Sequence, residues 1–372
     1  MRRDPPSPSP SPTAKKAEGG LAHLSREIAR LAADEPEREA FPSRAFDALR
    51  RLGLTARPPI GAGSGGELLR LLAAVGRGDL GVGRIFEGHV NALDLVARFG
   101  SGAIREAVAE EAGRGALFGV WNTDDVDAPL RVSGDRLAGR KSFASGVDGL
   151  SFAIVTAPVT TGRQMFLVRL AGVAVDRSWW KPLGMKSSGS HVVDFAGVPA
   201  EHIEALGRPD DYLKEPWFTG GAVRFAAVQA GGVEAVFDAA LAHLRRTGRA
   251  GNPHQAHRIG RMGLAVETVR LWRNAAGSAL DEALAAGGEG VAAEKLVATA
   301  NGFRSLVEDC AMRVLDEAER AVGAAGFNAP HPLERLVADL RTYLRQPNPD
   351  GALAGFAEWL VAGDRDAPGE AN

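Results

Sequence analysis

The sequence predicts a mainly α-helical protein with a central β module, and two observations carry that prediction. Long segments with apolar residues at helical spacing occupy the first and last thirds of the 372 residues. Between them, residues 116–205 hold short runs rich in Val, Phe and Ile, punctuated by Gly, Asp and Pro, which is typical of strands. The predicted order is therefore helices, a β module and a helix bundle.

Shifts in composition place the domain boundaries. Residues 1–19 repeat Ser and Pro, and we expect a disordered tail there because the segment holds too little apolar area to order itself. Helical spacing predicts an N-terminal helical domain over residues 20–115. The β module, residues 116–205, is expected to be a small antiparallel barrel or sandwich. Long helical patterns with short loops predict a four-helix bundle over residues 215–372.

Composition and charge exclude several function classes. The formal net charge is -2, with 44 Lys and Arg against 46 Asp and Glu, which gives no support to a nucleic-acid or anionic-membrane partner. The single cysteine, Cys310, excludes an intramolecular disulfide and a multi-Cys metal site, and we expect no metal. Met1 is not followed by an apolar signal segment, so a cytoplasmic protein is expected. Polar residues interrupt the most apolar segment, which argues against a membrane span.

One segment of the β module pairs an aromatic ring with a hydroxyl group. In "LAGRKSFASG", residues 137–146, Phe143 and Ser145 are two positions apart and face the same side if the backbone is extended. A flavin ring needs an apolar surface for stacking and a polar contact near its reactive nitrogen. The pair therefore indicates a flavin as a candidate ligand.

Five segments in order carry a resemblance to a known family. They are "FGVWNTDD", "LAGRKSFASG", "GMKSSGSHVVDFAGVPAEHI", "LRRTGRAGNPHQ" and "RAVGAAGFNAPHPLERLVADLR". Together they resemble motifs of the acyl-CoA dehydrogenase superfamily of flavoproteins, over nearly the whole chain after the tail. The resemblance implies that family's fold, in which an N-terminal helical domain, a small antiparallel β-barrel or sandwich and a C-terminal four-helix bundle follow one another.

The resemblance also implies FAD as cofactor and assigns residues to its ring. Trp121, Asn122 and Thr123 would line the flavin ring. Phe143 would take the place of the aromatic residue that stacks on the ring, and Ser145 would supply the hydroxyl near the reactive nitrogen.

A second set of residues is implied for the rest of FAD. Arg246, or Arg245, and Gln255 would reach its phosphate or ribose, and the turn from Gly323 to Gly326 would contact its adenosine part. In the family these contacts usually cross a dimer interface, so a homodimer or homotetramer is implied. Two departures put the adenosine end in doubt, because Arg320 stands where the family has glutamine and "GAAG" replaces the usual glycine pattern.

The sequence departs most at the catalytic base. Most members of the family place a glutamate shortly after the last motif, and counting without gaps puts that position on Pro347. Some members carry the acid in the first bundle helix next to an arginine, where this chain has Val223 before Arg224. Asp350 is the remaining candidate for the base, although an Asp-Gly pair also has its own reason to form a turn.

Three functions stay open at this stage. The first is an FAD-dependent dehydrogenase that oxidises an acyl thioester, bound to CoA or a carrier protein, with hydride transfer to flavin and an unidentified electron acceptor. The second is a flavin-dependent monooxygenase of the same fold, which would use oxygen and reduced flavin from a reductase and would need no base for flavin reduction. The third is a catalytically degenerate flavoprotein.

Overall fold

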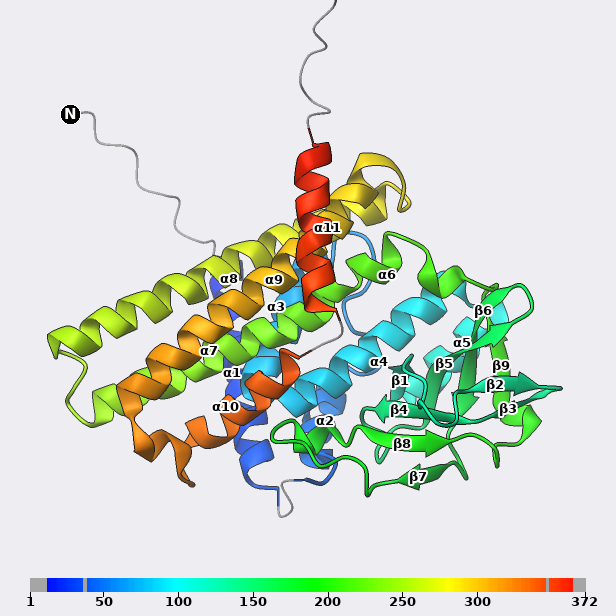
Figure 1. Ribbon diagram of the computed structural model, residues 1–372, viewed down its shortest axis with the longest axis horizontal. Helices are drawn as coiled ribbons and strands as arrows, with labels where there is room; N and C mark the ends of the chain where they lie inside the picture. Colours follow the sequence, from blue (N-terminus) through cyan, green and yellow to red (C-terminus); the bar gives the residue numbers. More distant parts are fainter. Residues whose placement is uncertain (1–11, 36–38, 346–347, 364–372) are drawn as a thin grey trace, which may run out of the picture.

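We describe the protein from a computed structural model, which covers residues 12–35, 39–345 and 348–363. A helical bundle fills one side of the molecule and a β module fills the other (Figure 1). The helix α4 (Leu80–Phe99) runs between them and packs on both. The arrangement confirms the predicted fold class, a mainly α-helical chain with a central β module.

The N-terminal part is helical up to residue 113. α1 begins at Pro12, so residues 12–19, which composition assigned to a tail, extend the first helix. This start agrees with the Ala, Lys and Glu residues of that stretch, which favour helix. Residues 1–11 of the expected tail lie outside the described residues. Besides α4, the helices are α1 (Pro12–Ala33), α2 (Ser43–Arg51), α3 (Gly65–Gly78) and α5 (Gly102–Gly113).

Short strands build the β module in three sheets. The sheet orders are β1-β5-β6-β9, β2-β3 and β4-β8-β7. The strands are β1 (Phe118–Trp121), β2 (Arg131–Ser133), β3 (Arg136–Ala138), β4 (Arg140–Ala144), β5 (Phe152–Val159), β6 (Gly162–Arg169), β7 (Ala174–Asp176), β8 (His191–Asp194) and β9 (Ile203–Leu206).

The expectation of an entirely antiparallel β module is wrong at one strand pair. β1 runs parallel to β5, with Phe118 opposite Phe152. Parallel neighbours require a long crossover connection, and residues 122–151 provide it. The other strand pairs among the described residues are antiparallel.

The C-terminal part is a bundle around α7. By length and composition the segment Trp217–Arg246 passes as a membrane span, yet 67% of its most apolar window is buried within the molecule, as in the core helix of a bundle. A final helix, α11, packs on α9. The helices are α6 (Trp217–Gly220), α7 (Ala222–Arg246), α8 (Pro253–Ala285), α9 (Gly290–Val322), α10 (Pro332–Tyr343) and α11 (Pro349–Ala362).

Glycines let α4 approach both of its neighbours. A Cβ added at Gly83 would lie 2.5 Å from Cγ1 of Val228 on α7. On the opposite contact, a Cβ added at Gly146 of the β module would lie 2.9 Å from Cγ2 of Ile85. Contacts this close leave no room for a larger side chain. The position of α4 between bundle and β module is therefore fixed by direct packing.

Candidate functional site

Phe143 presents an aromatic ring at the edge of the β module. Its φ of 54° lies in the left-handed region, which is an outlier for a bulky residue. The β4–β8 register shifts at this point. The ring is 50% exposed and packs edge-on against Trp179 and Trp180, at centroid distances of 4.9 and 6.0 Å. Strained positions of this kind gather at functional sites, so the exposed ring marks a candidate site.

Ser145 is buried and belongs to a chain of three serine hydroxyls. Ser188 Oγ donates to the carbonyl oxygen of Met185, and Ser190 Oγ lies 2.8 Å from both Ser188 Oγ and Ser145 Oγ. Each hydroxyl has one proton, so Ser190 donates to Ser188 and Ser145 donates to Ser190. Ser145 Oγ is left as an acceptor. The expectation of an extended backbone between Phe143 and Ser145 is wrong, because Phe143 has a left-handed φ and the β4–β8 register shifts there.

Three further predicted residues lie beside this pair at the end of β1. The indole Nε1 of the buried Trp121 donates to the backbone oxygen of Ser145 over 3.1 Å. The side-chain oxygen of Asn122 accepts a hydrogen bond from Thr156 Oγ1 at 2.5 Å. Thr123 is exposed. The structure thus brings the predicted ring-lining residues together, with Trp121 supporting the backbone of Ser145 from within the core.

A buried ion pair holds the strained strand in place. The ammonium of the fully buried Lys141 donates to Asp124 Oδ1 at 2.7 Å, and Arg163 binds the other carboxylate oxygen at 2.7 Å. Burial lowers the pKa of Lys141 to about 8, against the opposing effect of Asp124. Burial acts to raise the pKa of Asp124, but the hydrogen bonds from Lys141 and Arg163 outweigh it, and that pKa is lowered. Removal of Asp124 would leave the fully buried ammonium of Lys141 without a compensating charge.

The four remaining predicted cofactor residues lie at the other end of the bundle. Arg246 ends α7, and at about 1.5 Å per residue the helix places it roughly 36 Å from Ala222. Gly323 directly follows the end of α9, and Gly326 and Gln255 are buried near the same helix ends. The Gln255 Oε1 atom has no hydrogen-bond partner among the described residues. One protomer therefore does not bring these four residues together with Phe143 and Ser145.

Two histidines join the helices at that far end. His243 Nδ1 lies 3.3 Å from Arg246 Nη2 and 3.1 Å from His331 Nε2. A guanidinium only donates, so His243 Nδ1 accepts and His331 Nε2 carries a proton. His331 Nδ1 in turn accepts from the backbone N–H of Leu333. Burial, followed by neighbouring positive charge, lowers the pKa of both histidines, so the cluster is held in neutral form beside Arg246.

A stripe of charge on α4 is the feature that the sequence analysis missed. From Leu80 to Val96 every residue of α4 is buried except Arg84, Asn91 and Asp94. Between them, the buried Glu87 lies 2.8 Å from Arg84 and 3.8 Å from Arg224 of α7, one oxygen toward each. The signal that could have revealed it is the Arg-Glu pair three residues apart in a helix that is otherwise apolar at those positions.

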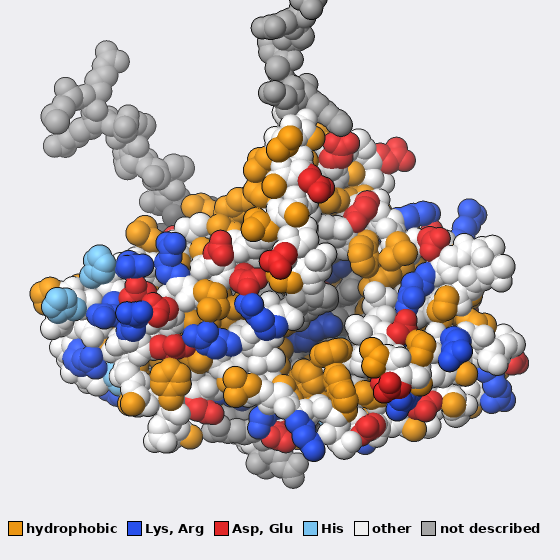
Figure 2. Space-filling view, viewed as in Figure 1, with side chains coloured by type: hydrophobic (Ala, Val, Ile, Leu, Met, Phe, Trp, Pro, Cys, Tyr) orange, Lys and Arg blue, Asp and Glu red, His pale blue; other side chains and the backbone are white. Residues whose placement is uncertain are grey.

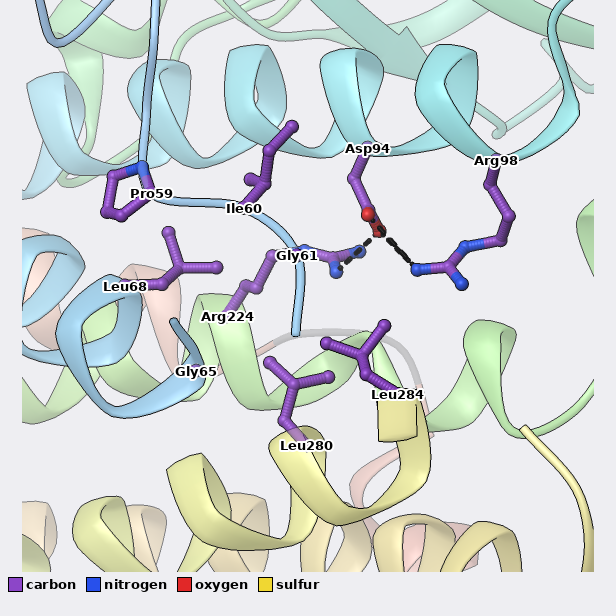
Figure 3. A pocket seen from close by; sticks show the side chains of 10 residues that line it. All are labelled: Pro59, Ile60, Gly61, Gly65, Leu68, Asp94, Arg98, Arg224, Leu280 and Leu284. Atoms are coloured by element: carbon purple, nitrogen blue, oxygen red, sulfur yellow. Dashed lines mark hydrogen bonds and ion pairs between the residues drawn. The ribbon is translucent and has the colours of Figure 1, made fainter. Parts of the chain in front are cut away.

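The charge stripe continues to a small cavity of about 10 Å³ (Figure 3). Asp94 lies between two arginines, 3.1 Å from Arg98 and 3.4 Å from Arg224. Arg98 also stacks on the ring of Trp217, 3.6 Å from its centroid. The cavity is lined by these charged residues together with apolar side chains and glycines, and its lining is Pro59, Ile60, Gly61, Gly65, Leu68, Asp94, Arg98, Arg224, Leu280 and Leu284.

Both tyrosines of the chain have phenols whose pKa is raised by burial. Tyr343, at the end of α10, is 2% exposed, and its hydroxyl has no hydrogen-bond partner among the described residues. Burial raises the pKa of Tyr343, with a further contribution from Glu87 against the effect of Arg84. Burial also raises the pKa of Tyr212 to about 12, again with a contribution from Glu87. Burial thus keeps both phenols neutral.

The surface is hollowed between the bundle and the β module, with Lys or Arg side chains inside the hollow (Figure 2). α4 crosses this part of the view in Figure 1. On α4, Gly81 and Ile85 contact the β module and Gly83 contacts α7. Helical geometry puts Arg84 on the side between those two contacts, where it is 23% exposed. Arg84 therefore faces the space between the bundle and the β module, which we call the cleft.

The positions at which the sequence analysis sought a catalytic base do not place an acidic side chain beside Arg224 on α7. Val223, at the α7 position next to Arg224, is fully buried and apolar. Asp350 is exposed in the first turn of α11. Pro347 lies outside the described residues. Among the described residues, Glu87 is the buried carboxylate that faces Arg224 from α4.

A larger cavity of about 510 Å³ lies apart from this cleft, among α1, α3, α7 and α10. Its main charged groups pair with one another. Arg335 binds Asp79 and Asp339, and Arg77 binds Asp238. Burial, followed by the charge of Asp79, raises the pKa of Asp339 to about 6. Asp339 Oδ1 also accepts the backbone N–H of Met185 at 2.6 Å, which ties α10 to the serine chain.

Comparisons with known proteins agree with this architecture. Residues 212–344 match the family model described as acyl-CoA dehydrogenase, C-terminal domain. A curated relative named "Putative acyl-CoA dehydrogenase YdbM", from Bacillus subtilis (strain 168), is 24% identical, and the match covers 90% of this chain and 93% of the relative. The amino sugar nitrososynthase DnmZ from Streptomyces peucetius is 28% identical, and the match covers 82% of each chain.

A solved structure shows the same fold over nearly the whole chain. The dibenzothiophene monooxygenase TdsC from Paenibacillus sp. A11-2, in complex with FMN and indole, superposes with a TM-score of 0.80. It is 17% identical, and the match covers 94% of this chain and 97% of TdsC. At this identity the likeness establishes the fold.

Proposed function

Because the chain has the acyl-CoA dehydrogenase-like fold, with that family's C-terminal domain at residues 212–344, we propose that it is a flavin-dependent oxidoreductase. Two reactions are open to such a protein. We place the monooxygenase reaction, driven by reduced flavin and oxygen, first. Dehydrogenation of an acyl thioester is the second candidate.

The residues at the edge of the β module suit a flavin ring. Phe143 offers an exposed, strained aromatic surface for stacking, and Thr123 is open beside it. Trp121 and Asn122 act one layer below, since their side chains hold Ser145 and Thr156. In this proposal Phe143 and Ser145 touch the flavin, and the residues behind them fix their positions.

One observation carries the choice of reaction, and it concerns Arg224. A dehydrogenase of this family removes a proton with a carboxylate held at the cleft. The α7 position beside Arg224 is the buried Val223, and the arginine is instead bound by groups of α4, namely Asn91 at 2.6 Å, Asp94 and Glu87. Glu87 compensates two arginines there. The site is built around fixed charge, which favours a reaction that needs no base for flavin reduction.

The serine chain supports the same choice. Ser145 donates its proton toward Ser190, so its oxygen is free to accept a hydrogen bond. A reduced flavin carries one more N–H donor in its central ring than an oxidised flavin, and an accepting hydroxyl suits the reduced form. When bound and reduced, the flavin supplies two electrons for oxygen activation. Substrate, O₂ and reduced flavin then give oxygenated substrate, water and oxidised flavin.

The cofactor and assembly follow from the same proposal. TdsC binds FMN in its solved complex, and the altered residues at the far bundle end weaken the case for an adenosine site. We therefore propose FMN or FAD, delivered in reduced form by a separate reductase in the cytoplasm. If FAD is used, Arg246, Gln255, Gly323 and Gly326 would have to reach it from a second protomer of a homodimer or homotetramer.

Dehydrogenation stands second because a specific observation favours it. Glu87 is a buried carboxylate beside the cleft, and YdbM bears the name of an acyl-CoA dehydrogenase. In this alternative the substrate is an acyl thioester on CoA or a carrier protein, and Glu87 or Asp350 would remove the proton.

Two measurements on the purified protein separate the two reactions. First, oxidised FMN or FAD is added, binding is measured by absorbance after gel filtration, and a panel of acyl-CoAs is mixed in without oxygen. Second, photoreduced FMN and ¹⁸O₂ are supplied with indole, dibenzothiophene or methanesulfinate, and products are analysed by mass spectrometry.

We expect no loss of the flavin band with acyl-CoAs and a product that carries one ¹⁸O atom from at least one probe. Bleaching by an acyl-CoA would establish dehydrogenation and overturn the monooxygenase proposal. A protein that binds neither reduced nor oxidised flavin would overturn both reactions. Flavin binding with neither bleaching nor labelled product would count against catalysis on these probes and favour a degenerate flavoprotein.

A further inference from the structure

We propose that the cleft selects a substrate with an anionic oxygen group, such as a carboxylate or a sulfinate, and that Arg84 binds this group. The inference rests on the proposed function, since it names the substrate class of that same cleft. It is carried by the charges, contacts and exposure of one cluster, formed by Arg84, Glu87, Asp94, Arg98 and Arg224.

The cluster holds one more positive charge than negative. Three arginines alternate with two carboxylates, in the spatial order Arg84, Glu87, Arg224, Asp94, Arg98. Each carboxylate is shared between two arginines. The excess charge therefore falls to the two ends of the row. Partly buried charge of this kind is screened weakly by water, so an anion gains from binding there.

The two ends differ in what covers them. Arg98 lies over the ring of Trp217 at 3.6 Å, and a ring face stabilises a cation. Arg84 has no such cover, and its one hydrogen bond to a described residue goes from Nη1 to Glu87 Oε2. A guanidinium has five N–H donors, so most of those on Arg84 are free for a ligand. The open end of the row is thus at Arg84, which faces the cleft.

A second donor points to a ligand at the same place. The hydroxyl of Tyr343 is fully buried, and it makes no hydrogen bond to any residue within the described ranges. Tyr343 ends α10, which packs on α4, and its backbone oxygen accepts a hydrogen bond from Gln229 of α7 at 2.9 Å, so it lies where α10 meets α4 and α7. A buried hydroxyl without a partner costs about 1 to 3 kcal/mol, and a bound anion would relieve that cost. A fork of guanidinium donors with a phenol beside it is suited to a planar, delocalised oxyanion.

The role of Glu87 in this proposal is to position Arg84. It lies one turn along α4 from Arg84 and fixes the guanidinium through Oε2, while Oε1 faces Arg224. The specificity of the cleft follows from this arrangement. A neutral substrate of the same shape leaves the excess charge of Arg84 uncompensated, whereas an anion neutralises it.

The test compares anions with neutral molecules of the same shape. Acetate and acetamide, benzoate and benzamide, and methanesulfinate and dimethyl sulfoxide are titrated into flavin-free protein, with tryptophan fluorescence as the readout. Trp179 and Trp180 beside Phe143 serve as reporters. The titration is repeated on FMN-loaded protein by flavin absorbance. We expect at least one anion to bind about tenfold more tightly than its neutral partner.

Variants assign the preference to Arg84. Arg84→Gln is expected to abolish the preference for the anion, and Arg84→Lys, which keeps the charge but loses the fork, is expected to retain part of it. Arg114→Gln is the matched control, because this arginine is exposed at the end of α5 and pairs with Glu110. Circular dichroism establishes that each variant is folded. Equal affinity for anion and neutral partner in the unaltered protein, or a preference that survives in Arg84→Gln, would overturn the proposal.

Two further comparisons test whether Arg84 binds the cofactor instead of the substrate and whether the anion site depends on the proposed function. The oxyanion could belong to the phosphate of FMN, so the affinities for FMN and riboflavin are compared in Arg84→Gln. A loss for FMN alone would assign Arg84 to the cofactor phosphate and overturn the substrate proposal. If the protein binds no flavin yet the flavin-free chain discriminates anions through Arg84, the anion site stands and the proposed oxidoreductase function fails.

Discussion

The two sides of α4 are held by opposite kinds of interaction. Toward the β module the helix presents Gly81, Ile85 and His89, which are packed tightly and are neutral. Toward the cleft it presents Arg84 and Glu87, whose charges are shared with α7. The packed side fixes where the helix lies, and that rigidity lets the other side hold a row of charges together with Arg224 of α7.

The largest loss of stability is expected from a substitution on the charged side of α4. Glu87→Ala leaves Arg84 and Arg224 without their common carboxylate, and loss of one member of a buried ion pair costs about 3 to 5 kcal/mol. Urea unfolding of the variant and of the unaltered protein measures the difference. Arg84→Ala is the matched comparison, because that arginine is more exposed and its loss leaves Glu87 paired with Arg224.

We expect Glu87→Ala to lower the free energy of unfolding more than Arg84→Ala does. A smaller loss for Glu87→Ala than for Arg84→Ala would mean that Glu87 does not bind the two arginines together. The charged side would then contribute no more to stability than an ordinary surface ion pair, at about 0 to 1 kcal/mol.

His89 makes the stability of the packed side depend on pH. Its Nε2 donates to the backbone oxygen of Thr55 at 2.7 Å, and its Nδ1 accepts from the N–H of Phe118 at 3.1 Å, so the ring is neutral. Burial lowers the pKa of His89 to about 4. As the pH falls from about 6.5 to 4, the unfolded chain takes up a proton before the folded protein does. Stability from this group is therefore full above pH 6.5 and is lost below it, by about 3 kcal/mol.

The variant His89→Gln isolates this effect from other titrating groups. Glutamine keeps a donor and an acceptor but does not titrate. The free energy of unfolding is measured by urea titration at several pH values between 4 and 7. We expect the advantage of the unaltered protein over His89→Gln to shrink as the pH falls. A constant difference across this range would contradict a neutral, buried His89.

Glycine substitutions test the packed side on a smaller scale. A Cβ added at Gly81 would fall on the hydroxyl of the buried Ser187, so Gly81→Ala is expected to destabilise the protein by about 1 to 3 kcal/mol. Gly88→Ala is the control on the same helix. There the added Cβ lies 3.5 Å from Arg84 Nη1, an ordinary contact, and the helix gains up to about 1 kcal/mol.

Thermal unfolding of both variants gives the comparison directly, with opposite signs expected. Two changes of the same sign and size would show that the β-module side of α4 is packed no more tightly than the cleft side.

The sequence was sufficient for those parts of the molecule that depend on local pattern. Apolar spacing predicted the helices and the bundle, and alternation with turn residues predicted the β module. The parallel pairing of β1 with β5 escaped it, because strand direction depends on which strands meet after a long crossover. The extended backbone assumed for Phe143 was wrong, because no residue type in "KSFAS" signals a left-handed aromatic residue.

The residues of the candidate site likewise divide into those that a local motif predicts and those that only tertiary packing brings together. Phe143, Trp121 and Ser145 lie in short segments of the chain, so motifs were enough to predict them as candidates, whereas Ser188 and Ser190 were not predicted. Glu87 and Arg224 are 137 residues apart in the chain, and their pairing depends on the packing of α4 against α7. On the sequence, Glu87 was one acidic residue among 46 Asp and Glu. Its burial and its two arginine partners, which are tertiary facts, distinguish it from the rest.

The smallest effect on stability and activity is expected at Asp350, the acidic residue that the sequence left as the candidate base. Asp350 is exposed in the first turn of α11, where its charge adds no more than about 0.5 kcal/mol through the helix dipole. Asp350→Asn is therefore expected to unfold at nearly the same urea concentration and to bind and oxidise flavin as the unaltered protein does. Glu358→Gln, also exposed on α11, is the matched control. If flavin reduction by an acyl-CoA were lost in Asp350→Asn alone, the base would lie on α11, and the charged side of α4 would have only a binding role.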